Sequence, residues 1–250
     1  MTHDSGRELE DLEPVDLLAV APHRDDAELL CGGTLARASD RGHATGILDL
    51  TRGEAGTRGS ARIRAREASR AAEVLGVDVR ANAGLPDAGI ANTDATRRRL
   101  VSFLRRLRPR VVVLPFHRGR HPDHRLTAEL GRDACYLAGV EKYGDDAEPH
   151  RPHKILYALA YREDPVKPTF VVDVTEQFDR KLEAVRCYES QFDGVEAAGE
   201  LFPNGQELYD LVETHGRRYG TLIRRPYGEP FHTDETMRVD DVVELDVRSM

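Results

Sequence analysis

The sequence has no tryptophan and few sulfur-containing residues: three methionines and three cysteines among 250 residues. Cys31, Cys135 and Cys187 are odd in number and far apart in the chain. Neither a disulfide framework nor a Cys-x-x-Cys metal site fits this spacing, and isolated thiols are typical of a reducing compartment. We therefore expect a cytoplasmic protein whose chemistry does not depend on paired cysteines.

Excess positive charge is also absent, because 36 Lys and Arg residues face 44 Asp and Glu residues, for a formal net charge of -8. A surface that neutralises a phosphate backbone needs the opposite balance, so we expect no nucleic-acid partner. No apolar run approaches the length of a membrane span, and residues 1–16 lack the basic start and apolar core of a signal peptide. We expect no membrane partner, a flexible leader over 1–16 and a single domain over 17–250.

Short apolar runs alternate with longer amphipathic stretches through the first half of the chain. This alternation is typical of an α/β fold in which helices cover both faces of a mainly parallel sheet. The pattern predicts strands at 17–21, 45–50, 77–81 and 111–115. It predicts helices over 63–75 and 93–107, and two more that end near residues 41 and 138.

The last third of the chain has weaker patterns. Strands are expected at 155–161 and 169–174, and helices near 176–188 and 206–222, whereas the tail from Pro226 gives no clear prediction. No linker, repeat or low-complexity tract separates this part from the rest. We expect it to continue the same domain and to supply a lid or an oligomer surface.

Three polar loops follow predicted strands: residues 23–28, residues 51–60 and residues 118–124. The carboxyl ends of parallel strands converge at one edge of a sheet, which is where ligands bind in such folds. His23 and Asp26 are spaced to reach one ion, and His124 can add a third ligand from another loop. Two histidines and a carboxylate leave coordination positions open, as in catalytic zinc sites. Asp25 is then available as a general base for a metal-bound water.

Each motif alone has a simpler interpretation. His-x-x-Asp is common by chance, and an acidic residue after a strand often caps the next helix. The residues His23-Arg24-Asp25 also match the start of a protein-kinase catalytic loop, but Leu30 stands where that loop has asparagine, and no nucleotide-binding glycine loop accompanies it. The occurrence of both histidine motifs after apolar strands favours the metal site. A zinc- or sugar-binding protein without turnover would need the ligands but not Asp25.

Other polar residues in these loops have two interpretations each. Asp123 would either orient a histidine by accepting its ring proton or cap the following helix. The loops at 51–60 and 118–124, which we call the mouth loops, carry guanidinium groups that could bind a substrate carboxylate, although arginine is abundant throughout the chain. These residues are Arg52, Arg58, Arg118 and Arg120. Cys31 lies beside the site, where packing is the simpler role.

The motifs and their order resemble the LmbE/PIG-L family of zinc N-deacetylases over nearly the whole chain: A-P-H-R-D-D-A-E followed by C-G-G-T-L, then L-T-R-G-E-A-G-T-R-G, L-P-D and H-P-D-H. The resemblance implies a Rossmann-like three-layer fold and one Zn²⁺ per subunit, bound by His23, Asp26 and His124. It also implies that Asp25 is the base and that His121 polarises the carbonyl or steadies the oxyanion. The remaining matched positions, near the sugar pocket, are Glu28, Arg64 and Asp87.

The segments S-Q-F, Y-G-E-P-F and M-R-V-D-D-V-V-E-L most resemble the deacetylases of bacillithiol biosynthesis, whose substrate is N-acetylglucosaminyl L-malate. A mycothiol precursor, a thiol S-conjugate or a chitin-derived sugar would suit the same chemistry. The family also implies a homo-oligomer, with hexamers among close relatives, and Fe²⁺ or Co²⁺ accepts the same ligands as zinc. Arg24 departs from the family, which has proline there; losing the ring frees a backbone angle, so we expect altered metal affinity or pocket charge.

Overall fold

The computed structural model describes residues 11–161, 166–192 and 208–247. These residues contain a seven-stranded sheet in the order β3-β2-β1-β4-β5-β7-β6. The strands are β1 Leu17–Ala21, β2 Thr45–Asp49, β3 Val79–Asn82, β4 Val111–Pro115, β5 Lys154–Ala158, β6 Phe170–Asp173 and β7 Gly228–His232. The helices are α1 Asp26–Asp40, α2 Ala61–Leu75, α3 Asp94–Leu107, α4 Pro122–Ala138, α5 Phe178–Arg186, α6 Glu189–Phe192 and α7 Leu208–Leu222.

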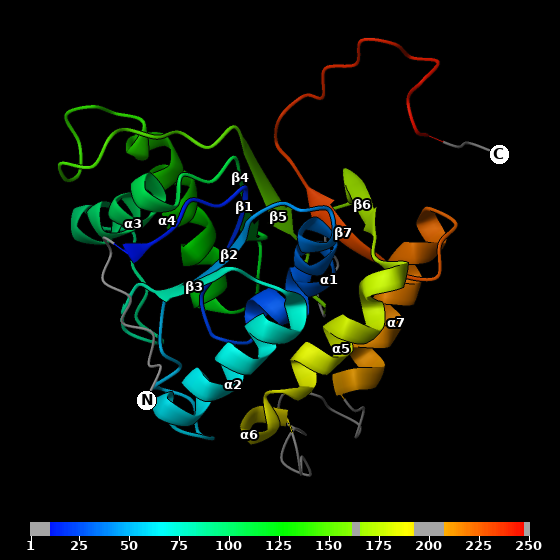
Figure 1. The fold of residues 1–250 in the computed structure, drawn as a ribbon, viewed down its shortest axis with the longest axis horizontal. Coiled ribbons are helices and arrows are strands. Elements are labelled where there is room, and N and C mark those ends of the chain that lie inside the picture. Colours follow the sequence, from blue (N-terminus) through cyan, green and yellow to red (C-terminus); the bar gives the residue numbers. More distant parts are fainter. Residues whose placement is uncertain (1–10, 162–165, 193–207, 248–250) are drawn as a thin grey trace.

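Strands β1 to β5 form the parallel part of the sheet and are covered on both faces (Figure 1). Side chains alternate along each strand, so Leu18 enters the core beneath α3 and α4, whereas Leu17 and Ala19 enter the core beneath α1, α2 and α5. Both faces are apolar because helices cover both, which explains the uninterrupted apolar run of β4. The prediction of a three-layer α/β fold with a mainly parallel sheet is confirmed.

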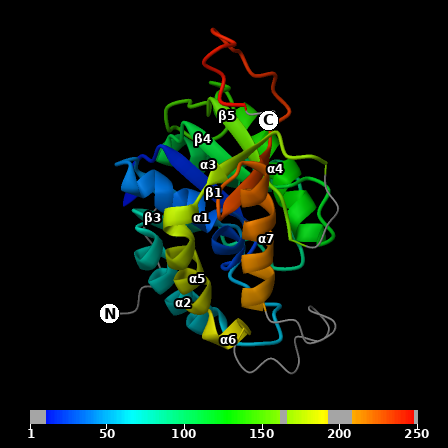
Figure 2. The same ribbon diagram turned by 90° about the vertical axis from the view of Figure 1, so that its right-hand side faces the viewer.

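Strand β7 was not predicted. It lies antiparallel between β5 and β6, with Ala158 opposite Phe231 and Val171 opposite Pro230. The strand is short and contains a proline, which lacks a backbone N–H and argues against a central strand in sequence reasoning. Helix α7 packs on β6 and β7 and lies beside α5 (Figure 2). The tail from Pro226 thus supplies an inner strand, and β6 forms the edge at this end of the sheet.

The predicted leader over 1–16 lies mostly outside the described residues, but its last part is not loose. Leu12 and Val15 are buried in the core beside α3, and the Val15 N–H donates to the Leu107 carbonyl. A flexible leader reaching residue 16 is therefore wrong for residues 12–16. Residues 206 and 207 of the predicted last helix also lie outside the described part. No helix in the described ranges has the length and apolarity needed to cross a membrane.

Helix α1 is kinked at Cys31, whose φ of -145° and ψ of 21° are not helical. Just after the kink, the backbone N–H groups of Gly33 and Thr34 both donate to the Glu229 carboxylate, at 2.9 and 2.7 Å. A Cβ atom at residue 33 would lie 2.8 Å from Val174 Cβ, so only glycine permits this approach. Strand β7 therefore fixes the direction of the helix that begins at the polar loop after β1.

Candidate metal centre

The three predicted ligands meet at the carboxyl edge of the sheet. His23 follows β1, Asp26 is the first residue of α1, and His124 lies in the first turn of α4. One potential ligand atom from each lies within 4.8 Å of the others. His124 is far from His23 and Asp26 in the sequence, and parallel pairing of β1 with β4 brings the two loops side by side. The donor set, two imidazoles and a carboxylate, is the one that divalent transition metals accept.

The Asp26 carboxylate lies between the two imidazoles. Its Oδ2 is 3.0 Å from His23 Nδ1, and its Oδ1 is 3.2 Å from His124 Nε2. Burial opposes ionisation of Asp26, but His124 and His23 together hold its pKa well below the usual range. Burial lowers the pKa of His124, and the Asp26 charge more than reverses this, so the net shift is upward. The carboxylate thus stays ionised at neutral pH, as a metal ligand must.

His23 faces carboxylates with both ring nitrogens. Its Nε2 lies 3.2 Å from Asp87 Oδ1 and 3.5 Å from Asp123 Oδ2, on the side away from Asp26. Burial lowers the pKa of His23, but hydrogen bonding and charge from Asp26 raise it to about 9 overall. Metal-binding histidines commonly donate their second ring N–H to a carboxylate, which fixes the ring orientation. The structure therefore places Asp87 and Asp123 where they can orient His23.

Asp123 does not cap α4. Residue His121 holds the N-cap position and its Nδ1 accepts from the Asp123 backbone N–H at 3.2 Å. The Asp123 carboxylate, 1% exposed, instead accepts from the Ala88 N–H at 2.9 Å while facing His23. Of the two interpretations of Asp123, the structure favours the one that orients a histidine.

Asp25 is a half-buried residue whose carboxyl lies beside the three candidate ligands. It occupies the N-cap position of α1, yet its side chain makes no capping hydrogen bond. Burial and the neighbouring charge of Asp26 raise the pKa of Asp25 to about 6, against opposing contributions from His23 and Arg64. A carboxyl group with a pKa near neutrality can both accept and return a proton at physiological pH. The position and the pKa suit a general base.

His121 completes the ring cluster, with its ring centroid 5.0 Å from that of His23 and 5.4 Å from that of His124. Burial, with the charges of His23 and His124, lowers the pKa of His121, which favours the neutral imidazole. Because Nδ1 accepts from a backbone N–H, the hydrogen-bond pattern assigns the remaining proton to Nε2. A neutral ring with Nε2–H is a donor that can meet a developing oxyanion.

Glu28 does not lie where a substrate could reach it, which corrects the prediction for this residue. Its side chain is 0% exposed, and Oε1 accepts from Arg80 Nη1 at 2.5 Å and from the Tyr188 hydroxyl at 2.9 Å. These partners come from β3 and from the segment between α5 and α6, so the carboxylate faces the protein interior rather than the mouth. Glu28 is thus a buried structural group behind the loop.

Arg64, matched to a position near the sugar pocket, is buried at 8% exposure. Its guanidinium donates to the Gln191 side-chain carbonyl and lies so close to Gly53 and Gly56 that a Cβ atom at either glycine would clash with it. The glycine-rich loop therefore wraps around Arg64. The positive charge of Arg64 acts to lower the pKa of Asp25.

The arginines predicted in the mouth loops lie on the surface. Arg52, Arg118 and Arg120 are exposed and Arg58 is half-buried. Arg24, by contrast, is 4% exposed and its guanidinium donates to the Ala61 carbonyl at 2.6 Å. Of the two effects expected from Arg24, the burial of its guanidinium argues against altered pocket charge, and altered metal affinity stays a prediction.

Several residues that hold the loops in place were missed by sequence reasoning. Glu54 accepts from the backbone N–H groups of Arg52 and Asp87, and thereby joins two of the loops. Arg80 and Tyr188 hold the first loop from behind. The S-Q-F segment contained the signal for Gln191, but nothing marked Arg80, which lies in a weakly patterned strand.

Comparison with known proteins defines the class of protein. The pattern of the GlcNAc-PI de-N-acetylase (PIG-L) family matches residues 18–135. A diacetylchitobiose deacetylase of Thermococcus kodakarensis is 33% identical, over 83% of this chain and 82% of its own. The solved structure of a conserved protein from Thermus thermophilus is 40% identical, covers 90% of this chain and 98% of its own, and superposes with a TM-score of 0.81. The chain belongs to the PIG-L family.

Two further relatives define how far the likeness extends. A probable N-acetyl-alpha-D-glucosaminyl L-malate deacetylase 2 of Bacillus anthracis is 30% identical, over 70% of this chain and 81% of its own. A 4-oxalmesaconate hydratase of Pseudomonas putida is 27% identical, over 70% and 73%. Family membership confirms the predicted enzyme class, a deacetylase that hydrolyses an amide bond. The bacillithiol-type subgroup is not singled out, because the chitobiose enzyme matches at higher identity and over more of the chain.

Proposed function

We propose that this protein is a zinc-dependent N-deacetylase that releases acetate from a small molecule containing N-acetylglucosamine. The observation that carries the proposal is the Asp25 carboxyl, which follows His23 and Arg24 in the loop and lies beside the His23, Asp26 and His124 donor set. A binding protein needs the donor set but has no use for a further carboxyl at that position. The presence of Asp25 beside the ligands therefore favours turnover.

The residues divide the work of amide hydrolysis as follows. His23, Asp26 and His124 would hold the Zn²⁺ ion, which would supply a Lewis acid for the acetyl carbonyl and for the attacking water. Asp25 accepts the proton of the attacking water as the water oxygen approaches the carbonyl carbon. His121 Nε2–H donates to the carbonyl oxygen as negative charge develops there. Either Asp25 or His121 then protonates the leaving amine, and acetate and the free amino sugar result.

The proposed substrate class rests on the named relatives and on the mouth loops. The Thermococcus relative supports a chitin-derived disaccharide, and the Bacillus relative supports N-acetylglucosaminyl L-malate. Exposed guanidinium groups of Arg52, Arg118 and Arg120 suit a substrate with carboxylates, which favours the malate conjugate. Arg64 and Asp87 are proposed to flank the sugar, because both are fixed beside the candidate metal centre.

We also propose that the protein is a cytoplasmic homo-oligomer, of six subunits as the family resemblance implies, and that Fe²⁺ or Co²⁺ can replace Zn²⁺. The separate chain carries every group that the proposed chemistry needs, so the oligomer is not required to complete the site.

Acetate release tests the proposed function. Purified protein would be assayed with N-acetylglucosaminyl malate, diacetylchitobiose and free N-acetylglucosamine, before and after chelation and zinc restoration. We expect turnover that chelation and Asp25→Ala abolish and that the exposed control variant Asp146→Ala retains. Preference for the malate conjugate over the disaccharide would establish the finer substrate. Zinc binding without acetate release, or hydration of 4-oxalmesaconate instead, would overturn the deacetylase proposal.

A further inference from the structure

The backbone carbonyl between His23 and Asp25 is held by two buried donors from distant parts of the chain. Arg80 Nη2 donates to the Arg24 carbonyl at 2.6 Å, and the Tyr188 hydroxyl donates to the same oxygen. Arg80 lies in β3, and Tyr188 lies between α5 and α6. This carbonyl belongs to the peptide that joins Arg24 to Asp25, so its position sets where the Asp25 side chain begins.

Both donors are themselves held in place. Arg80 forms a two-point pair with Asp49, with Nε to Oδ2 and Nη2 to Oδ1 both at 2.9 Å. Glu28 Oε1 accepts from Arg80 Nη1 at 2.5 Å and lies 2.9 Å from the Tyr188 hydroxyl, whose single proton is shared between Glu28 and the Arg24 carbonyl, so Glu28 links the two donors. Planar guanidinium groups paired at two points have little freedom to rotate. The donors therefore present fixed positions to the Arg24 carbonyl.

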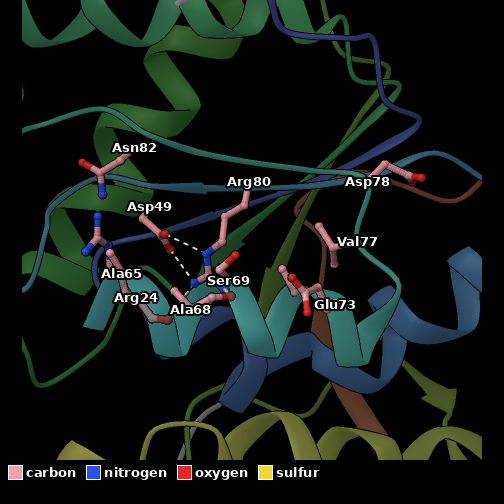
Figure 3. Close-up of a pocket in the computed structure, with 11 residues that line it drawn as sticks. Arg24, Asp49, Ala65, Ala68, Ser69, Glu73, Val77, Asp78, Arg80 and Asn82 are labelled. Carbon is pink, nitrogen blue, oxygen red and sulfur yellow. Dashed lines mark hydrogen bonds and ion pairs between the residues drawn. The ribbon is translucent and has the colours of Figure 1, made fainter. Parts of the chain in front are cut away.

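Hydrogen bonds, rather than close packing, determine this arrangement on the α2 side. A cavity of about 290 Å³ is lined by Arg80 and Asp49 from the sheet and by Ala65, Ala68 and Ser69 of α2, with Arg24 at one end (Figure 3). Beside the cavity, Arg80 Nη1 donates to the Ala68 carbonyl at 3.0 Å, so a hydrogen bond also fixes the guanidinium against α2. Arg24 itself reaches the Ala61 carbonyl, so the residue is anchored by its side chain and its backbone.

We propose that Arg80, Tyr188 and Glu28 form a carbonyl clamp that positions the loop from His23 to Asp26. Proline restricts a loop by fixing φ, and this chain has Arg24 instead. The clamp supplies an equivalent restriction through the carbonyl of the same residue. The clamp fixes the distance from Asp25 to the metal ligands. Its role in catalysis therefore rests on the proposed function, in which Asp25 is the base. Its members touch neither substrate nor metal and are positioning residues.

Tyr188→Phe tests the clamp most cleanly, because it removes one hydroxyl and keeps the buried ring. Tyr136→Phe, on a ring 63% exposed in α4, is the matched control. We expect Tyr188→Phe to weaken Zn²⁺ affinity about tenfold in competition with a chromophoric chelator, a loss equal to about one buried hydrogen bond. With zinc saturating, kcat should fall about tenfold and KM should change less than twofold. The control should change neither.

Glu28→Gln is the second variant, because it keeps the shape of the group but removes the charge that holds Arg80. We expect it to shift zinc affinity and kcat in the same direction as Tyr188→Phe. If either variant lowers the thermal midpoint but leaves zinc affinity and kcat per folded molecule unchanged, the network is only structural and the proposal is wrong. The zinc measurement needs no turnover, so it still decides the clamp if the wild-type protein releases no acetate.

Discussion

The two ends of the chain contribute to the site in different ways. The part from β1 to α4 carries the three candidate ligands, Asp25 and His121, all on loops at the carboxyl edge of the parallel sheet. The part from β5 to α7 and β7 carries none of these groups within the described residues. It instead supplies Tyr188, Gln191 and Glu229, which contact the loop, Arg64 and the kinked helix α1. Reactive groups and the groups that position them thus come from different regions.

This division has a physical reason. A ligand-bearing loop must hold polar and charged atoms close together, and such a loop has little apolar surface with which to stabilise itself. Buried partners from other elements replace that missing packing. Changes in the first region should therefore lower the catalytic rate more than the stability. Changes in the second region should lower the stability first.

The largest expected effect is on the rate, in the first region. Asp25→Asn removes the proposed base and should lower kcat by roughly a thousandfold, within the range for loss of general base catalysis. Because burial and Asp26 raise the pKa of Asp25 to about 6, its ionised form destabilises the fold at neutral pH. We therefore expect Asp25→Asn to leave the free energy of unfolding unchanged or higher at pH 7. Steady-state kinetics and urea unfolding on the same samples measure both, and a large loss of stability would contradict the comparison.

The second effect is on stability, in the second region. Glu229 accepts from Lys181 Nζ at 2.6 Å, and both side chains are 3% exposed. Burial lowers the pKa of Lys181, but Glu229 more than reverses this, so the amine stays charged. Glu229→Gln leaves that charge buried without a counter-charge and should cost about 3 kcal/mol of unfolding free energy. Urea unfolding measures the loss.

The matched control for this pair is the double variant Glu229→Gln with Lys181→Met. It removes both charges, so it should recover much of the stability lost by Glu229→Gln alone. If the single variant is as stable as the wild type, the buried pair does not hold β7 against α1. The second region would then be less important for the site than its contacts suggest.

The two regions also differ in how much of them could be predicted from sequence. Strand bounds at 17–21 and 111–115 match the structure because apolar runs flanked by polar loops define them. Gly-Glu-Pro-Phe-His of β7 has no such run, and its pairing depends on β5 and β6 more than on its own residues. Long-range pairing of this kind leaves little local signal.

The same reasoning applies within the site. His23 and Asp26 were predicted because metal ligands require particular residue types at short spacing, and His124 because it follows another strand whose end meets the same edge of the sheet. The clamp could not be predicted, since Arg80 reaches the Arg24 carbonyl across 56 positions and any residue type has a carbonyl. For the same reason Glu28, a carboxylate near the ligands in sequence, was wrongly assigned to the substrate pocket, although it points to Arg80.

The third prediction concerns pH and the second region. His215 in α7 lies against the rings of Tyr161 and Tyr219, and its Nε2 is buried without a hydrogen-bond partner among the described residues. Burial, and then the charge of Lys181, lower the pKa of His215 from 6.5 to about 3. The unfolded state therefore binds the extra proton first, and stability is lost as the pH falls from about 6.5 toward 3.

His215→Gln removes this titration, so the variant should lose less stability than the wild type on acidification. The difference between the two proteins should reach about 2 kcal/mol near pH 5. Unfolding free energies measured at pH 7 and pH 5 give it directly. If the unfolding free energies of both proteins depend on pH in the same way, His215 is not a buried neutral residue. The second region would then be less tightly packed than its contacts indicate.

The smallest effect compares two helix caps within the first region. Thr93 Oγ1 accepts from the Thr96 N–H at the start of α3, and Ser60 Oγ accepts from the Ile63 N–H at the start of α2. Thr93→Ala and Ser60→Ala should each cost about 1 kcal/mol of unfolding free energy. The first turn of α2 contains the Ala61 carbonyl that anchors Arg24, whereas the first turn of α3 contacts none of the proposed site residues in the described interactions. Only Ser60→Ala should therefore lower kcat/KM, by a few fold, and equal kinetics in both variants would show that the Arg24 anchor is dispensable.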